Sequence, residues 1–316
     1  MDIIKNILFF MLGLAFLYFG GEGLVKGSSR LARSRGINPI VIGLTIVAFG
    51  TSAPEFMVSI VAALRGSSDL VIGNIVGSNI ANIGLILAIS ALISPLMIQM
   101  TLLKIEVPIM IILSIILYVL AFNLTIGLFE GMLILLCLTA FVIYSSISAF
   151  KESRIVASEY QEFLGKDNSF LKNSLFIVLG ITALIIGARL VVNSSMFMAR
   201  EVGISELVIG ITAVAVGTSL PELSTSIVAA YRKEHDIVVG NIIGSNIFNI
   251  GILGFVSIIH PIDVNSSVLK YELPVMILFA LSAIPIMKTG SKVSRLEGIL
   301  LLLFYSLFVI FLFRNT

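Results

Sequence analysis

Charged residues are scarce in this sequence. Of its 316 residues, 12% are Asp, Glu, Lys or Arg, whereas 58% are hydrophobic. A soluble globular protein carries about 25% charged residues, and half of that fraction cannot cover the surface of a protein of this size. Most of the surface must therefore face lipid, and the composition predicts a protein that crosses the membrane several times.

Cysteine and histidine are also rare. The single cysteine, Cys137, excludes an internal disulfide bond. The two histidines, His235 and His260, form no cluster with metal-ligand spacing, and a formal net charge of +2 gives no basic surface for nucleic acid. The sequence contains no recognisable pair of a catalytic nucleophile and a general base, so it does not indicate an enzyme. We expect no cofactor and no obligate protein partner.

Long apolar runs follow one another along the chain. Ten of them reach the roughly 20 residues that a membrane-spanning helix needs, and they are continuous rather than alternating, which disfavours strands. The expected fold is an all-α integral membrane protein with ten transmembrane helices. The expected spans are 6–27, 37–64, 70–94, 103–122, 127–150, 171–198, 205–231, 237–259, 269–287 and 296–313.

The loops between these spans differ in positive charge. Most of the 20 Lys and Arg residues fall on the side that holds residues 151–170, the longest polar stretch. By the positive-inside rule this side is cytoplasmic. We therefore expect a multi-pass protein of the plasma membrane with both termini outside and the central loop in the cytoplasm.

The sequence repeats itself at an offset of 167 residues. Val41–Gly84 aligns without a gap with Val208–Gly251, and 29 of 44 positions are identical. We divide the chain into a first five-helix repeat (1–150), a linker loop (151–170) and a second five-helix repeat (171–316). Because five is odd, the second repeat enters the membrane upside down. Inverted repeats that meet at a midplane site are typical of alternating-access transporters.

Each repeat places an acid directly after a proline inside an apolar run. Glu55 follows Pro54 in "AFGTSAPE", and Glu222 follows Pro221 in "AVGTSLPE". Proline interrupts the helix before it, so we expect free carbonyls near Ala48–Thr51. Acids and free carbonyls within a membrane are tolerated where they face protein or a watery cavity. We expect the two acids to meet at the midplane with a cation between them.

A plainer interpretation is a capping box, in which Ser52 and Glu55 only begin a helix. That interpretation leaves the presence of two such acids within lipid unexplained. The following spans add polar side chains in the motif "GNxxGSN": Asn74, Ser78, Asn79 and Asn82, with Asn241, Ser245, Asn246 and Asn249. All these groups are oxygen ligands, which suit Ca²⁺ and Na⁺ rather than zinc or copper.

The paired motifs resemble the two α-repeats of the Ca²⁺/cation antiporter superfamily. The resemblance to its short prokaryotic Na⁺/Ca²⁺ exchangers covers the whole chain. It implies a secondary antiporter that exchanges Ca²⁺ for Na⁺ by alternating access, within a lipid bilayer. It also implies a Ca²⁺ site made of the Glu55 and Glu222 carboxylates with the carbonyls of Thr51 and Thr218.

The same resemblance implies two Na⁺ sites and a polar centre. The outer Na⁺ site would comprise Ser52, Ser219, Thr218, Glu222 and the Ala48 carbonyl. The inner one would comprise Thr51, Ser78, Ser245, Glu55 and the Ala215 carbonyl. Asn82 and Asn249 would line the centre beside the glutamates. Some family members carry Asp at the position of Asn249, and the amide here disfavours K⁺ dependence.

Two other functions stay open. A Ca²⁺/H⁺ antiporter shares the fold, and its two acids would carry protons, but that branch usually has "GN" where this chain has "GT". A cation channel is a different class, against which the inverted repeat and the single midplane site argue.

Overall fold

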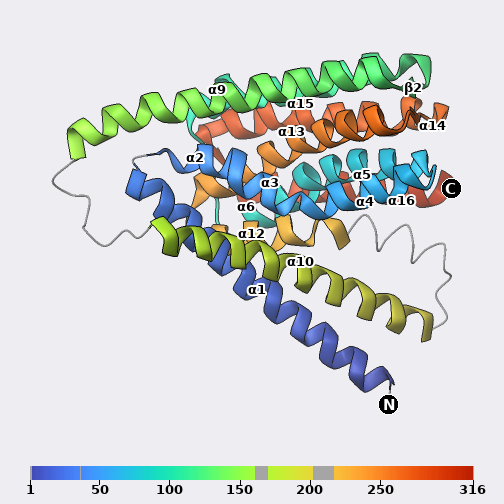
Figure 1. The fold of residues 1–316 in the computed structure, drawn as a ribbon, viewed down its shortest axis with the longest axis horizontal. Helices are drawn as coiled ribbons and strands as arrows, with labels where there is room; N and C mark the ends of the chain where they lie inside the picture. The colour runs from blue at the N-terminus through green and yellow to red at the C-terminus, as the bar shows by residue number, and fades with distance from the viewer. Residues whose placement is uncertain (1, 36, 161–169, 202–216, 316) are drawn as a thin grey trace.

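The computed structural model describes residues 2–35, 37–160, 170–201 and 217–315. Most of the long helices run side by side, and α1 and α10 cross them obliquely (Figure 1). In the first half the helices are α1 (Asp2–Arg35), α2 (Pro39–Ile42), α3 (Ala48–Thr51), α4 (Ala53–Leu64), α5 (Ser68–Ala81), α6 (Ala88–Ile93), α7 (Met100–Lys104), α8 (Glu106–Leu120) and α9 (Leu128–Tyr160). In the second half they are α10 (Phe170–Glu201), α12 (Leu220–Tyr231), α13 (His235–Ile259), α14 (Ser266–Lys270), α15 (Glu272–Lys288) and α16 (Arg295–Asn315).

Short irregular and extended pieces complete the fold. Two π-helical turns, η1 (Gly43–Val47) and η2 (Asn82–Leu87), join α2 to α3 and α5 to α6, while η3 (Ala121–Asn123) and η4 (Thr289–Ser291) are 3₁₀ turns. Four two-residue strands lie outside the apolar spans. β1 (Leu96–Met97) pairs with β4 (Lys292–Val293), and β2 (Thr125–Ile126) pairs with β3 (Ile262–Asp263), both antiparallel.

Within the described ranges, eight helices are long and apolar enough to cross a membrane. A ninth span is counted when the bent pair Pro39–Thr51 and Ala53–Leu64 is taken as one. The expected span at 205–231 lies partly outside the described residues. The other expected spans are each found at close to their predicted positions.

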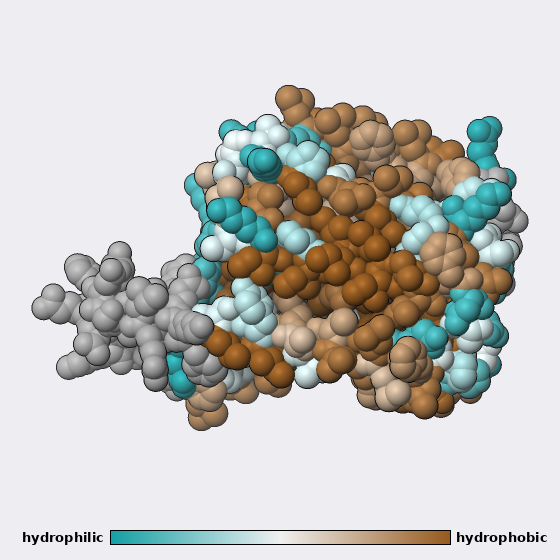
Figure 2. Space-filling model, turned by 90° about the horizontal axis from the view of Figure 1, so that it is seen from above, coloured by the Kyte–Doolittle hydropathy of each residue, from teal (hydrophilic) through white to brown (hydrophobic). Residues whose placement is uncertain are grey.

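Two of these spans form the centre of the molecule. In the most apolar windows of Ser68–Ile93 and His235–Ile259, 78% of the residues are buried, compared with 17% for Ile3–Ala32 and 11% for Arg295–Leu312. Figure 2 shows hydrophobic residues across the middle of one face and hydrophilic residues gathered toward its two ends. The helices that carry the repeated polar motifs are thus enclosed by helices that expose apolar side chains.

Helices α1 and α10 approach each other through glycines. A Cβ atom on Gly20 would lie 2.9 Å from the Gly180 carbonyl oxygen, and one on Gly187 would lie 2.8 Å from the Gly13 carbonyl oxygen. Larger residues at these positions would push the two helices apart. The pair therefore packs backbone to backbone, as small residues permit in membrane helices.

Polar contacts also tie α1 to the core. Arg232, just after α12, forms an ion pair with Glu22 of α1. The Ser29 hydroxyl donates a hydrogen bond to Glu234 at 2.7 Å. These contacts join the C-terminal half of α1 to the loop between α12 and α13.

The expectation of a polar loop over 151–170 is wrong for its first part. Helix α9 continues to Tyr160, because the segment 151–160 contains neither proline nor glycine and nothing in it stops a helix. Hydropathy falls there, but helix formation does not depend on hydropathy alone. Residues 161–169 lie outside the described part of the chain.

Candidate cation site

Both halves interrupt a helix at an equivalent serine. Ser52 separates α3 from α4 with φ −78° and ψ 7°, and the helices on its two sides are bent by 43°. Ser219 precedes α12 with φ −85° and ψ 4°. Pro54 and Pro221 occupy the first turns that follow, where a missing N–H is tolerated. The predicted break at the first proline is confirmed, and the second serine has the same geometry.

The hydroxyl of each serine donates a hydrogen bond to the opposite half of the protein. Ser52 Oγ donates to Glu222 Oε1 at 3.0 Å, and Ser219 Oγ donates to Glu55 Oε1 at 3.4 Å. Neither hydroxyl caps its own helix. The capping-box interpretation of Ser52 and Glu55 is therefore wrong, since each serine bonds to the acid of the other half.

A second pair of hydrogen bonds also links the two halves. Thr51 Oγ1 donates to Asn241 Oδ1 at 3.0 Å, and Thr218 Oγ1 donates to Asn74 Oδ1 at 3.1 Å. The Asn74 amide also donates to the Glu55 carbonyl oxygen at 3.1 Å. Both asparagines are thus held in place by the broken helices and turn their side-chain oxygens toward the opposite threonine. The asparagine of each "GN" therefore positions the broken helix of the opposite half, and it lies on the helical face that the sequence indicated.

The two carboxylates lie in the interior. Glu55 and Glu222 are each 1% exposed, and they are close enough for the charge of Glu222 to act on Glu55. Like charges in such a place repel unless a cation or protons lie between them. The expectation that the acids come together is consistent with this arrangement.

Several buried oxygens in this region have no hydrogen-bond partner among the described residues. The atoms without a partner are Glu55 Oε2, Glu222 Oε2, Asn82 Oδ1, Asn249 Oδ1 and Ser245 Oγ. Leaving a buried polar atom unpaired costs about 1–3 kcal/mol, and more for a charged group. Carboxylate, amide and hydroxyl oxygens such as these are the ligand types that hard cations bind.

Polar side chains of α5 and α13 extend the site. Ser219 Oγ lies 3.3 Å from Ser78 Oγ, and Asn82 follows Ser78 by one turn. Asn249 donates to Asn79 Oδ1 at 3.0 Å, whereas neither amide atom of Asn82 has a partner. Asn82 also begins the π turn η2, while α13 is regularly α-helical at Asn249. The two halves therefore differ at this pair of positions.

The carbonyl expected to be free at Ala48 is already bonded. Its oxygen accepts a hydrogen bond from the Ser52 amide at 3.0 Å and lies 3.3 Å from the Thr51 hydroxyl oxygen. The helix ends at Thr51, within the expected range Ala48–Thr51, and the proline removes the donor that would reach the Gly50 carbonyl rather than that of Ala48. A carbonyl oxygen has two lone pairs, so the bonded Ala48 oxygen can still contact a cation. Ala215, the counterpart of Ala48, lies outside the described residues.

Close helix packing brings these groups together. A Cβ atom on Gly244 would lie 2.5 Å from the Leu44 carbonyl oxygen and 2.7 Å from Ala48 Cβ. Only glycine lets α13 approach the first broken helix this closely, which places Asn241 and Ser245 beside it. Among the described residues there is no group of three His, Cys, Asp or Glu side chains that could hold a metal. A cation here would be neutralised by two carboxylates and coordinated by neutral oxygens.

Comparison with known proteins identifies the family to which the chain belongs. A model described as "sodium/calcium exchanger protein" matches residues 5–148 and again residues 172–314. The chain belongs to the sodium/calcium exchanger family. Its two matches correspond to the two sequence repeats.

Relatives of this exchanger family align over almost the whole chain. The sodium/calcium exchanger MaX1 of Methanosarcina acetivorans is 37% identical and is aligned over 98% of this chain and 99% of its own. The putative antiporter CaxA of Alkalimonas amylolytica is 35% identical over 94% of this chain and 95% of its own. The resemblance expected from the motifs is confirmed.

Solved structures of an exchanger share the fold. The sodium-calcium exchanger NCX_Mj soaked with 2.5 mM Na⁺ and 0.1 mM Ca²⁺ matches with a TM-score of 0.85 and 31% identity, over 97% of this chain and 98% of its own. The same protein soaked with zero Na⁺ and Ca²⁺ matches with a TM-score of 0.86. The chain is a helical, multi-pass membrane protein of a transporter family rather than an enzyme.

Proposed function

We propose that this protein exchanges Ca²⁺ for Na⁺ across the membrane by alternating access. The observation that carries the proposal is the pair of buried carboxylates, each bonded to a serine of the opposite half and each with one oxygen left unpaired. Family membership and the printed functions of MaX1 and NCX_Mj support the choice of ions.

The charge of the site explains why the two ions would compete. Glu55 and Glu222 together carry two negative charges, which one Ca²⁺ or two Na⁺ ions can neutralise. Binding of both sets at once would leave excess positive charge in a medium of low dielectric constant, where it is costly. Mutually exclusive occupancy of one site is the condition that antiport requires.

The proposed ligands divide between the ions. Ca²⁺ would take both carboxylates with the carbonyls of Thr51 and Thr218. The outer Na⁺ site would comprise Ser52, Ser219, Thr218, Glu222 and the Ala48 carbonyl, and the inner one Thr51, Ser78, Ser245, Glu55 and the Ala215 carbonyl. Asn82 and Asn249 would line the centre. A hydroxyl that donates its hydrogen to a carboxylate still offers lone pairs to a cation, so the observed serine contacts agree with these roles.

We further infer the topology. Ten spans would form two inverted five-helix repeats, 1–150 and 171–316, with both termini outside the plasma membrane and the central linker in the cytoplasm. The equivalent contacts at an offset of 167 residues support this inference, as do the separate family matches to each half. Loop cysteines labelled from one side of sealed vesicles would test the orientation.

Flux measurements test the function. Proteoliposomes loaded with Na⁺ and diluted into Na⁺-free buffer should take up ⁴⁵Ca²⁺, and an equal pH gradient without Na⁺ should drive no uptake. Uptake driven by the pH gradient alone would identify a Ca²⁺/H⁺ antiporter. Uptake driven by the Ca²⁺ gradient alone, with no Na⁺ gradient and no pH gradient, would identify a channel.

A further inference from the structure

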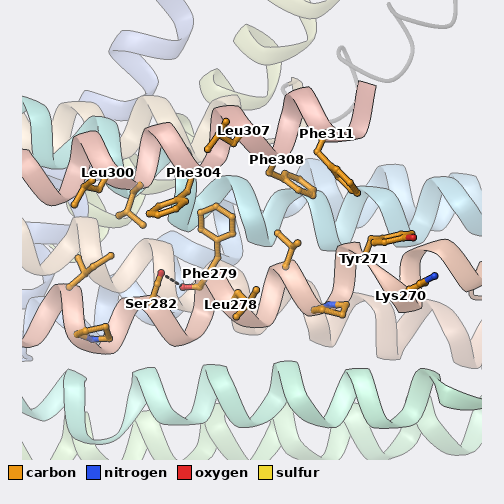
Figure 3. Close-up of a pocket in the computed structure, with 15 residues that line it drawn as sticks. Lys270, Tyr271, Leu278, Phe279, Ser282, Leu300, Phe304, Leu307, Phe308 and Phe311 are labelled. Carbon is orange, nitrogen blue, oxygen red and sulfur yellow. Dashed lines mark hydrogen bonds between the residues drawn. The ribbon is translucent and has the colours of Figure 1, made fainter. Parts of the chain in front are cut away.

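A long apolar groove lies between α15 and α16, away from the cation site (Figure 3). Its volume is about 780 Å³, and its lining includes Leu278, Phe304 and Leu307, each more than half exposed. The Ser282 hydroxyl in the lining donates to the Phe279 carbonyl of its own helix at 2.7 Å. The walls therefore offer hydrocarbon contacts and little hydrogen bonding.

The groove has the dimensions of a lipid chain site. Its lining on α15 runs from Pro274 to Ile286, which corresponds to about 18 Å along the helix. Lys270 and Tyr271, which precede α15, extend the groove toward the membrane surface. The hydrocarbon core of a bilayer is about 30 Å thick. A chain that enters from the membrane surface near Lys270 can therefore lie along the groove over most of its length.

One end of the groove carries positive charge. Lys270 and Tyr271 line that end, and the Tyr271 ring lies 5.6 Å from the ring of Phe311. Arg314 follows Phe311 by three residues and so lies on the same face of α16, where it is exposed. Lys270, Arg314 and the neighbouring, half-buried Glu272 together carry one net positive charge.

We propose that this groove binds one anionic phospholipid, with an acyl chain between α15 and α16 and its phosphate beside Lys270 and Arg314. Basic pockets between membrane helices bind anionic lipid headgroups, here in the outer leaflet of the inferred topology, and tyrosine is favoured at the interface. A zwitterionic lipid fills the same apolar groove but gains less from the two cations.

The chain contains no tryptophan, so one introduced tryptophan reports on its own surroundings. Phe304→Trp places the reporter in the groove, and Leu136→Trp places it on the exposed face of α9, where Leu136 is 66% exposed. Both variants are reconstituted in phosphatidylcholine vesicles with equal amounts of brominated phosphatidylglycerol or brominated phosphatidylcholine. We expect stronger quenching of Phe304→Trp by the anionic lipid and equal quenching of Leu136→Trp by both. Leu307→Trp replaces Phe304→Trp if that variant does not fold.

Removing the two charges tests the headgroup contact. The double change Lys270→Gln and Arg314→Gln should reduce the preference for the anionic lipid by roughly fivefold for each cation. Lys104→Gln changes the same charge at the equivalent position of the first half and should leave the preference intact.

Three results would overturn the proposal. One is equal quenching of Phe304→Trp by both lipids, and another is a preference that survives the double change. A third is a groove reporter that neither lipid quenches while Leu136→Trp is quenched normally. That last result would mean that a protein segment, such as a second copy of the chain, covers the groove.

Discussion

Replacing Glu55 with Gln should abolish Ca²⁺ transport while stabilising the ion-free protein at alkaline pH. Glu55 is 1% exposed and one of its carboxylate oxygens has no partner. When Glu55 and Glu222 are both ionised and no cation is bound, each is an uncompensated buried charge that costs several kcal/mol. The neutral amide removes that charge and its repulsion of Glu222. The stability gain should shrink at acidic pH, where protons neutralise the pair.

The effect on binding follows from charge. Two unit charges about 4 Å apart interact by about 4 kcal/mol at an effective dielectric constant near 20, so a divalent ion loses about 8 kcal/mol with one carboxylate. If half of each loss is offset because less charge is desolvated, about 4 kcal/mol remains for Ca²⁺ and about 2 kcal/mol for Na⁺. These values correspond to roughly a 1,000-fold loss of affinity for Ca²⁺ and a 30-fold loss for Na⁺.

Two assays check this prediction together. Thermal unfolding with and without Ca²⁺ should show a higher ion-free midpoint and no Ca²⁺-induced shift, and Na⁺-driven ⁴⁵Ca²⁺ uptake should be absent. Glu222→Gln should behave in the same way because the site is pseudo-symmetric. Glu130→Gln is the matched control, since Glu130 bonds to the Gly127 amide outside the site. Near-normal Ca²⁺ flux in Glu55→Gln, or a lower ion-free midpoint at alkaline pH, would refute the paired-carboxylate reasoning.

Four further changes have separate expected outcomes. Ser52→Ala should lower Na⁺ affinity by roughly tenfold, because it removes one proposed oxygen ligand of the outer Na⁺ site, a loss of about 1.5 kcal/mol if it matches that of a hydrogen bond to a charged group, as the Na⁺ dependence of ⁴⁵Ca²⁺ flux will show. Asn249→Asp adds a third negative charge, so exchange should become stimulated by K⁺, as flux with and without K⁺ will show. Replacing 161–169 by a Gly/Ser linker of equal length should leave the Na⁺ dependence of flux unchanged. Cysteines at Gly21 and Ser224 should cross-link α1 to α12, stop exchange and leave Ca²⁺ binding measurable.

The cross-link has a matched control. A Cβ atom on Gly21 would lie 3.4 Å from Ser224 Oγ, and one on Gly23 would lie 3.4 Å from the Phe176 carbonyl oxygen of α10. Cysteines at Gly23 and Phe176 join α1 to α10, which we expect to move together, and should permit exchange. Both pairs are made in a Cys137→Ser background. Exchange at the normal rate by the α1–α12 cross-linked protein would show that α1 is not the moving part. An effect of linker replacement on Na⁺ dependence would assign a role in coupling to 161–169.

The repeat and its helix breaks could be predicted because their signals are local. Proline removes a backbone donor and favours a break on its N-terminal side, and an acid inside an apolar run is conspicuous without knowledge of the fold. Glu55 and Glu222 were therefore identified from the sequence. The positions of Asn74 and Asn241 followed from helical periodicity, although their bonds to Thr218 and Thr51 did not.

The partners of the two serines could not be predicted. Ser52 has the same spacing to Glu55 in a capping box as in the observed site, and only the packing of the halves decides that its hydroxyl reaches Glu222. The state of the Ala48 carbonyl depends on whether the helix ends before or after Thr51, a difference of one residue. The length of α9 was missed because loss of hydropathy was taken as loss of helix.

Locating a bound ion tests the central claim most directly. Crystals of the protein with Sr²⁺ in place of Ca²⁺ give an anomalous signal that marks the ion itself. We expect one strong peak between Glu55 and Glu222, within about 2.6 Å of a carboxylate oxygen of each, as in other sites for hard divalent cations. The peak should disappear when 100 mM Na⁺ replaces Sr²⁺. A peak elsewhere, or one that persists at full strength in Glu55→Gln, would contradict the account.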